Sequence, residues 1–156
     1  MSRTLGPVPT WAKVTTFVLS LIGLALATYL TITHFDPQAL YCTDKGLFNC
    51  GVVTHSGESR FLGIPVAFLG LGTYLVMTAL NSPWGWRAKN YWVHVARFVI
   101  AIISMCFVLW LLYAELIIID NLCLYCTGVH IVTFALLIVL TRVSPSQLGW
   151  VTSRTE

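Results

Sequence analysis

Paired cysteines are the residues of this sequence whose type and spacing could do chemistry. Four of its five cysteines form two pairs along the chain, Cys42 with Cys50 and Cys123 with Cys126 in a C-L-Y-C motif. A C-x-x-C ring is small, so closing it removes little chain entropy and makes a weak structural staple. The same spacing is typical of dithiols that exchange with other disulfides. The second pair therefore favours redox chemistry over a purely structural role.

The predicted surroundings of the two pairs support a relay. An apolar run follows the second pair and predicts a helix with Cys126 in its first turn, where free N–H groups and the helix dipole stabilise a thiolate. Thiolate is the attacking species in disulfide exchange, and a lipid-soluble oxidant can reach the membrane edge. The first pair lies in a polar stretch with Gly46 and Asn49. We therefore expect a mobile loop disulfide that meets a soluble partner and passes electrons to the second pair.

Other interpretations of the cysteines stay open. Outside the cytoplasm paired cysteines form stable disulfides, so a non-enzymatic four-helix membrane scaffold with two structural disulfides is the main alternative. Structural zinc sites usually have two close-spaced ligand pairs, which the C-x7-C spacing of the first pair does not provide. Covalent haem needs His directly after the second cysteine, and here Thr127 follows. We expect no metal site, and we interpret Cys106 as a packing residue inside an apolar run.

The composition indicates that lipid surrounds most of the chain. Apolar residues make up 57% of the 156 residues and charged residues 10%, whereas soluble domains carry about 25% charged residues. Spanning the hydrocarbon core takes about 20 apolar residues, and four runs reach or approach that length. We predict an all-α integral membrane protein, one domain over residues 1–156, built as a four-transmembrane-helix bundle. The predicted helices cover about 14–34, 64–80, 95–119 and 122–141.

The basic residues predict the orientation of this bundle. Lys and Arg collect on the cytoplasmic side of membranes, and an even number of spans places both termini on one side. That side would hold seven of the nine Lys and Arg residues, and the other side only Lys45 and Arg60. We expect a multi-pass cell-membrane protein with cytoplasmic termini, a large extracytoplasmic loop over 35–63, and the paired cysteines outside. The seven residues are Arg3, Lys13, Arg87, Lys89, Arg97, Arg142 and Arg154.

Two further classes of protein fit poorly. Nucleic-acid-binding domains have a basic stripe or an isoelectric point above about 9, whereas these basic residues are scattered and the isoelectric point is about 8.7. A transporter would show broken spans or intramembrane charge runs, and the predicted spans show neither. We expect membrane lipid rather than nucleic acid as the surroundings. The aromatic cluster near the predicted cytoplasmic ends is interpreted as an interfacial belt; it comprises Trp84, Trp86, Tyr91 and Trp92.

Two ionisable residues inside predicted spans are candidates for chemistry. Carboxylates in membrane helices are costly and often functional, so Glu115, about two turns before Cys123, is a candidate proton acceptor. Anchoring of the outward loop and extension to the membrane interface are the alternatives. His130 lies four residues after Cys126, one helical turn deeper on the same face. It could hydrogen-bond or protonate an oxidant, or it could be a packed histidine bonded to a backbone carbonyl.

Short motifs follow one another in a particular order along the chain. They are Cys42, Asn49-Cys50, Val53, Ser56, Gly63-Ile64-Pro65-Val66, Gly70, Tyr74, Glu115-Leu116, Ile119, Cys123-Leu124-Tyr125-Cys126 and His130. In this order, over roughly residues 19–140, they resemble the vitamin K epoxide reductase family in its bacterial branch. The bacterial disulfide-bond formation B proteins also have four helices and two cysteine pairs. Their C-x-x-C comes in the first outward loop, so the order of motifs separates this chain from them.

The resemblance implies a fold and a role for each cysteine. It implies a four-helix bundle around a quinone pocket, with the C-x-x-C motif at the mouth of the pocket. Cys42 would react with a thioredoxin-like partner, and Cys50 would pass electrons to Cys123. Cys126 would then reduce the quinone, either menaquinone or ubiquinone. The expected activity is quinone-linked oxidation of dithiols, which supports disulfide bond formation.

The resemblance also implies quinone-binding residues and a separate partner. Ser56 would lie on a short helix over the pocket, and with Glu115 and His130 it completes the candidate quinone-binding set. Many bacterial members carry a thioredoxin-like domain fused after an extra helix. This sequence shows neither, so we expect a separate thioredoxin-like thiol oxidase on the extracytoplasmic side. Animal members carry tyrosine where His130 stands, so vitamin K epoxide is not carried over as a substrate.

Overall fold

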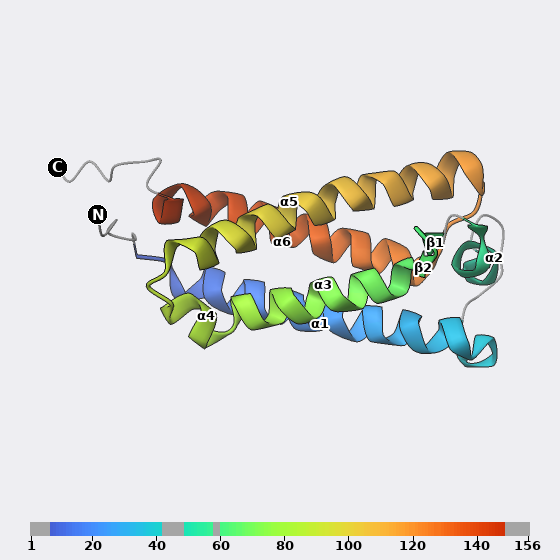
Figure 1. The fold of residues 1–156 in the computed structure, drawn as a ribbon, viewed down its shortest axis with the longest axis horizontal. Coiled ribbons are helices and arrows are strands. Elements are labelled where there is room, and N and C mark those ends of the chain that lie inside the picture. Colours follow the sequence, from blue (N-terminus) through green and yellow to red (C-terminus); the bar gives the residue numbers. More distant parts are fainter. Residues whose placement is uncertain (1–6, 42–48, 58–59, 149–156) are drawn as a thin grey trace.

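The body of the molecule is a bundle of long helices. The computed structural model describes residues 7–41, 49–57 and 60–148. Within these ranges the long helices are α1 (Thr10–Phe35), α3 (Val66–Asn81), α5 (Tyr91–Tyr113) and α6 (Leu124–Leu148). They run along one common axis (Figure 1). α1 packs against α3 and α6, and α6 also packs against α5.

The helices are apolar enough to place the molecule in a membrane. Among the described residues, three stretches are long and apolar enough to span a bilayer, namely Thr10–Phe35, Tyr91–Ile118 and Leu124–Pro145. α3 is apolar but has 16 residues, about 24 Å of helix, whereas the hydrocarbon core is about 30 Å thick. A mostly helical membrane protein is therefore confirmed, and a fourth spanning helix stays a prediction.

Two helix ends differ from the prediction at proline residues. The second predicted span includes Pro65, but α3 begins at Val66 and Pro65 is its N-cap, with a ψ of 131°. The N-cap of α1 is also a proline, Pro9, with a ψ of 143°. The last predicted span ends near residue 141, but α6 continues through Pro145 to Leu148. Proline lacks one N–H group and so removes one helical hydrogen bond, and in α6 this loss falls close to the end of the helix.

The end of α5 is irregular in a way that no sequence period indicates. After α5, the segment η3 (Ala114–Ile118) is a π-helix. Its wider turn is seen in the hydrogen bond from the N–H of Ile119 to the carbonyl of Ala114, at 2.9 Å. Asp120 then takes a φ of 52°, and the chain reverses toward α6. The π-helical turn changes which side chains of this segment face the bundle.

Short elements cover one end of the bundle, where we expected a large loop with a short helix near Ser56. Two short strands pair antiparallel and form a hairpin. Leu62 and Gly63 at its tip both have positive φ, as a type I′ turn requires. Figure 1 shows these elements beside the start of α6, and we call this the α2 end. The elements are η1 (Pro37–Ala39), α2 (Cys50–His55), β1 (Arg60–Phe61) and β2 (Ile64–Pro65).

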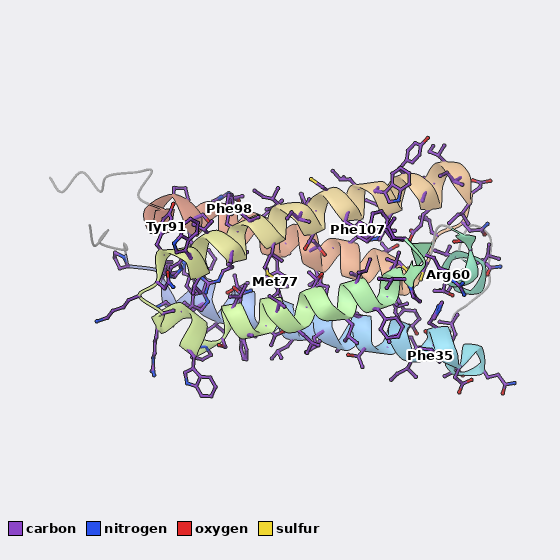
Figure 2. The ribbon with its side chains drawn as sticks, in the orientation of Figure 1. Phe35, Arg60, Met77, Tyr91, Phe98 and Phe107 are labelled. Atoms are coloured by element: carbon purple, nitrogen blue, oxygen red, sulfur yellow. The ribbon has the colours of Figure 1, made fainter. Side chains whose placement is uncertain are left out.

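The contact between α1 and α3 depends on a glycine. A Cβ atom on Gly23 would overlap the aromatic ring of Tyr74. The Tyr74 hydroxyl lies 2.8 Å from Thr133 Oγ1 and donates to the carbonyl of Val129 at 3.3 Å, both on α6. One side chain thus connects three helices. Figure 2 shows Met77 one turn further along α3, where it points into the bundle.

The opposite end holds a buried arginine that the sequence assigned to a cytoplasmic flank. This is the α4 end, named after α4 (Pro83–Arg87). Arg97 is only 2% exposed, and its guanidinium lies 3.6 Å from the ring centroid of Trp86. It donates to the carbonyl of Leu80 and to Nδ1 of His94. Trp86 is therefore part of the packing around Arg97, and among the predicted belt residues Trp84 and Trp92 are the well-exposed ones.

Candidate active site

The C-x-x-C motif lies at the junction between η3 and α6. Cys123 directly precedes α6 and is completely buried, and Cys126 lies in the first helical turn and is half-buried. Both residues are free thiols. The backbone N–H of Cys126 donates to Cys123 Sγ at 3.3 Å, and the two side chains hydrogen-bond each other. Cys123 therefore occupies the N-cap position, where its sulfur takes the role that a Ser or Asp oxygen usually has.

In this geometry an N–H group at the start of α6 stabilises a different sulfur from the one that the sequence suggested. The hydrogen bond from the Cys126 thiol, supported by the backbone N–H of Cys126, holds the pKa of Cys123 below its ordinary value although burial opposes it. The sequence argument placed this stabilisation on Cys126 instead. A lower pKa favours the thiolate form of Cys123, and thiolates are the reactive species in disulfide exchange.

Cys50 lies against the same junction from the other side. It is the first residue of α2, is completely buried, and is disulfide-bonded. Cys50 and Cys123 share one apolar cluster with Leu30 and Val53. Cys42, the predicted partner of Cys50, lies outside the described residues. The structure therefore brings together one cysteine of each predicted pair in a water-free contact region.

Asn49 fixes α2 in this place. Its side-chain oxygen accepts the N–H of Val52 at 3.1 Å and so caps α2. Its backbone N–H donates to the carbonyl of Leu122 at 3.0 Å. Asn49 and Leu122 each directly precede a cysteine of the cluster, so this backbone bond ties Cys50 and Cys123 to a common frame.

Glu115 contacts both cysteines of the C-x-x-C motif. Its carboxyl lies against the Cys126 thiol and the backbone N–H of Cys123. The residue is 3% exposed, and its Oε2 atom is buried without a hydrogen-bond partner in the described part of the chain. Of the three interpretations drawn from the sequence, extension to the interface does not match this position. Proton acceptance and anchoring of the outward loop stay predictions.

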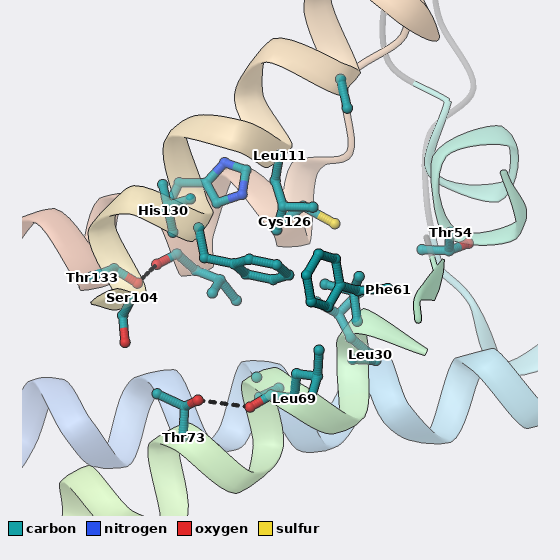
Figure 3. A pocket seen from close by; sticks show the side chains of 18 of the residues that line it. Leu30, Thr54, Phe61, Leu69, Thr73, Ser104, Leu111, Cys126, His130 and Thr133 are labelled. Atoms are coloured by element: carbon teal, nitrogen blue, oxygen red, sulfur yellow. Dashed lines mark hydrogen bonds between the residues drawn. The ribbon is translucent and has the colours of Figure 1, made fainter. Parts of the chain in front are cut away.

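A large cavity opens beside these groups. Its volume is about 440 Å³, within the range of about 300–1,000 Å³ that small-molecule sites have. It lies between α3 on one side and α5 and α6 on the other, close to the α2 end (Figure 3). Its walls are mainly apolar, and the rings of Phe61 and Phe107 meet edge to face there at 5.5 Å. Its polar lining includes Ser56, Thr73, Ser104, Glu115, Cys126, His130 and Thr133.

All three candidate quinone-binding residues line this cavity. Ser56 is the C-cap of α2 rather than a residue within it, and its hydroxyl donates to the carbonyl of Val53 at 2.9 Å. His130 is 5% exposed, and its Nδ1 has no hydrogen-bond partner among the described residues. Figure 3 shows His130 and Cys126 on the same wall of the cavity. Glu115 and Cys126 both line the cavity, and the Glu115 carboxyl lies beside the Cys126 thiol.

The sequence argument missed a tyrosine pair at the α2 end. The hydroxyl of Tyr125, inside the C-L-Y-C motif, donates to the carbonyl of Tyr41 at 2.7 Å. The ring of Tyr125 lies 4.6 Å from that of Tyr29, whose hydroxyl accepts the N–H of Tyr41 at 2.8 Å and donates to Ala39. The aromatic residue within the motif was the available signal. These bonds hold the chain that follows η1 against the C-x-x-C motif.

Cys106 does not take part in the site. It is an exposed free thiol on α5, so the predicted packing role is not what the structure gives it. It does not line the cavity. Within the described ranges no group of three or more His, Cys, Asp or Glu residues is arranged to hold a metal ion.

Apolar helices long enough to span a bilayer, two neighbouring thiols and an apolar cavity beside them describe a membrane protein with a candidate thiol site. Residues 14–141 match the vitamin K epoxide reductase family, so the chain belongs to that family. This confirms the resemblance inferred from the motifs. Membership makes the protein a membrane oxidoreductase, of a family that in general uses quinone or vitamin K substrates.

Proposed function

We propose that the protein is a quinone-dependent thiol oxidoreductase that supports disulfide bond formation. It takes electrons from a separate thioredoxin-like protein outside the cytoplasm and passes them to menaquinone or ubiquinone in the bilayer. One observation carries the proposal. The free thiol of Cys126 lines an apolar cavity, while Cys123 is buried in contact with the cluster that holds the disulfide-bonded Cys50.

The electron path follows this arrangement. A reduced partner attacks the Cys42–Cys50 disulfide at Cys42, and resolution leaves two loop thiols and an oxidised partner. Cys50 then attacks Cys123 of the inner disulfide and releases the Cys126 thiolate, and Cys42 re-forms the loop disulfide.

The final step returns the inner pair to its oxidised state. The thiols of Cys123 and Cys126 lose two electrons and two protons and form a disulfide bond. The quinone gains both electrons and both protons and becomes the quinol. His130 supplies a hydrogen-bonding nitrogen to the cavity, and Ser56 and the aromatic walls complete the surface that would hold the ring. In this two-electron step, each 30 mV by which the potential of the quinone exceeds that of the dithiol contributes about 1.4 kcal/mol of driving force.

The orientation proposed from the sequence has structural support. Stable disulfides form outside the cytoplasm, and the disulfide-bonded Cys50 lies at the α2 end. Figure 2 shows Arg60 at that end as well. Lys13, Arg87 and Lys89 lie at the opposite end, in the first turn of α1, at the last residue of α4 and just after α4. We place the α2 end outside, the α4 end in the cytoplasm, and α3 as the fourth span.

Anaerobic quinone reduction by the purified protein tests the proposal. With a dithiol donor, the wild-type protein should reduce a menaquinone or ubiquinone analogue, and Cys126→Ala should not. Cys106→Ala is the matched control, because Cys106 is an exposed thiol outside the cavity, and it should retain full activity. A wild-type protein inactive with both quinones, whose two cysteine pairs resist mild reductant, would instead be a scaffold with structural disulfides.

A further inference from the structure

The surroundings of Glu115 suggest more than an anchoring role. A carboxylate inside a membrane helix is costly unless its charge is stabilised or used. One side of this carboxyl lies against the Cys126 thiol and the N–H of Cys123. The other side, Oε2, is buried and unpartnered in the described part of the chain, and the residue lines the cavity. The carboxyl therefore bridges the reacting thiol and the space that a substrate would fill.

The π-helical turn is what places the carboxyl there. Ala114 and Glu115 are buried, whereas Leu116 and the two residues after it are exposed on the outer face. The carbonyl of Glu115 accepts the N–H of Asn121 at 3.1 Å, so the turn is fixed at its far end. Single π-helical turns inside α-helices occur frequently at functional sites. Here the turn brings a carboxyl to the sulfur of Cys126.

We propose that Glu115 is a catalytic proton-transfer residue, which takes the protons of the C-x-x-C thiols and passes them to the quinone. The proposal rests on the function proposed above. It assigns to one carboxyl the proton movement that must accompany the two electrons.

The protons and electrons balance through this carboxyl. The S–H proton of Cys126 passes to the Glu115 carboxylate, and from there to one quinone oxygen. The carboxylate is then free to accept the proton of Cys123, which reaches it through the hydrogen bond between the two sulfurs. The second proton goes to the other quinone oxygen. The two sulfurs lose two electrons and form the S–S bond, the quinone becomes the quinol, and Glu115 ends as the carboxylate.

A purely structural role for Glu115 makes a different prediction. The carbonyl oxygen of glutamine can accept hydrogen bonds from Cys126 and Cys123, but an amide cannot take up and release a proton at neutral pH. Glu115→Gln therefore keeps the turn and removes the proton transfer. Glu115→Asp restores a carboxyl that is one methylene shorter. Asp120→Asn is the matched control, since it removes an exposed carboxylate five residues away in the same turn.

The test combines quinone turnover with the alkylation rate of Cys126, located by peptide mass spectrometry. We expect Glu115→Gln to lower turnover by about 10²-fold, the smaller end of the range for general acid–base groups. Its alkylation should be no slower than in the wild type, because the amide keeps the turn and removes a negative charge beside the sulfur. Glu115→Asp should recover part of the turnover, and Asp120→Asn should behave as the wild type.

Two results would overturn the assignment. Turnover of Glu115→Gln within about threefold of the wild type would remove the need for a proton-transfer carboxyl. An equal fall in turnover and in Cys126 alkylation would show that the variant disorders the turn, which is the structural role. A wild-type protein that reduces no quinone overturns the proposed function together with this inference. The first two results leave the proposed function in place, so the failures are distinguishable.

Discussion

At the scale of residues, the two cysteine pairs meet through Cys50 and Cys123. Both are completely buried in one apolar cluster. The double variant Cys42→Ala/Cys126→Ala should therefore form a Cys50–Cys123 disulfide on mild oxidation, detected by peptide mapping without reductant. Cys42→Ala/Cys123→Ala is the matched control and should form far less of the Cys50–Cys126 disulfide. Equal cross-linking in both would contradict an electron path that enters at Cys123.

His130 carries a second prediction at this scale. Its buried Nδ1 has no partner in the described structure and lines the cavity. A hydrogen bond from this ring to a quinone carbonyl would contribute about 1–1.5 kcal/mol, so His130→Ala should raise the KM for quinone roughly tenfold. Thiol alkylation at Cys126 should stay unchanged. A normal KM with a lowered kcat would point to a different role for the imidazole.

The sequence located these residues better than it described their surroundings. Spacing placed His130 one turn below Cys126, and the structure has both on one cavity wall. Glu115 could be named as an intramembrane carboxylate, but its contact with Cys126 depends on a π-helical turn that leaves no periodic signature. The sequence assigned the stabilised sulfur to Cys126, whereas in the structure it is Cys123. Which residue becomes the N-cap depends on where α6 begins, and a helix boundary is set by the surrounding fold.

At the scale of elements, α2 is positioned by its N-cap. Asn49 supplies the side-chain N-cap of α2. Replacing such a cap with alanine costs about 1 kcal/mol, so Asn49→Ala should loosen α2 beside the C-x-x-C motif. In the Cys42→Ala/Cys126→Ala background, it should slow the cross-link between Cys50 and Cys123 severalfold. Asn49→Asp retains a capping oxygen and should cross-link at the original rate.

The contact between α1 and α3 gives a prediction about stability. A Cβ atom on Gly23 overlaps the ring of Tyr74, which is held by hydrogen bonds to α6. Gly23→Ala should destabilise the protein by about 1–3 kcal/mol, as overpacking does, measured as a lower thermal midpoint in detergent. Gly72→Ala is the control on the exposed side of α3, where a Cβ meets nothing within 4 Å. It should be neutral or stabilising.

At the scale of the whole molecule, the proposed orientation can be tested with introduced cysteines. Leu62 and Trp84 are highly exposed at the α2 end and the α4 end. In a Cys106→Ala background, a membrane-impermeant maleimide should label Leu62→Cys in intact cells. Trp84→Cys should be labelled only after the membrane is opened. The reverse pattern would place the cysteine pairs in the cytoplasm and remove the extracytoplasmic partner from the proposal.

The overall architecture followed from composition, and its details did not. Uncharged apolar runs predicted the long helices because every backbone group in lipid must be bonded within the chain. Basic residues were counted as flanking charges, but Arg97 lies inside the bundle over Trp86. A single arginine gives no sequence signal for an aromatic partner eleven residues away. The same limit applies to Tyr125, whose bond to Tyr41 spans 84 residues.

The short length of α3 has a consequence for the lipid around the protein. With 16 residues it covers about 24 Å, so as a fourth span it is several ångströms shorter than an average hydrocarbon core. Lipids next to a short span thin locally to match it. The cavity lies along α3, so this thinning falls on the flank where a membrane-dissolved substrate would enter. Under the proposed function, a quinone head group there would sit closer to the plane of Cys126, and bilayer thickness would then influence the rate of turnover.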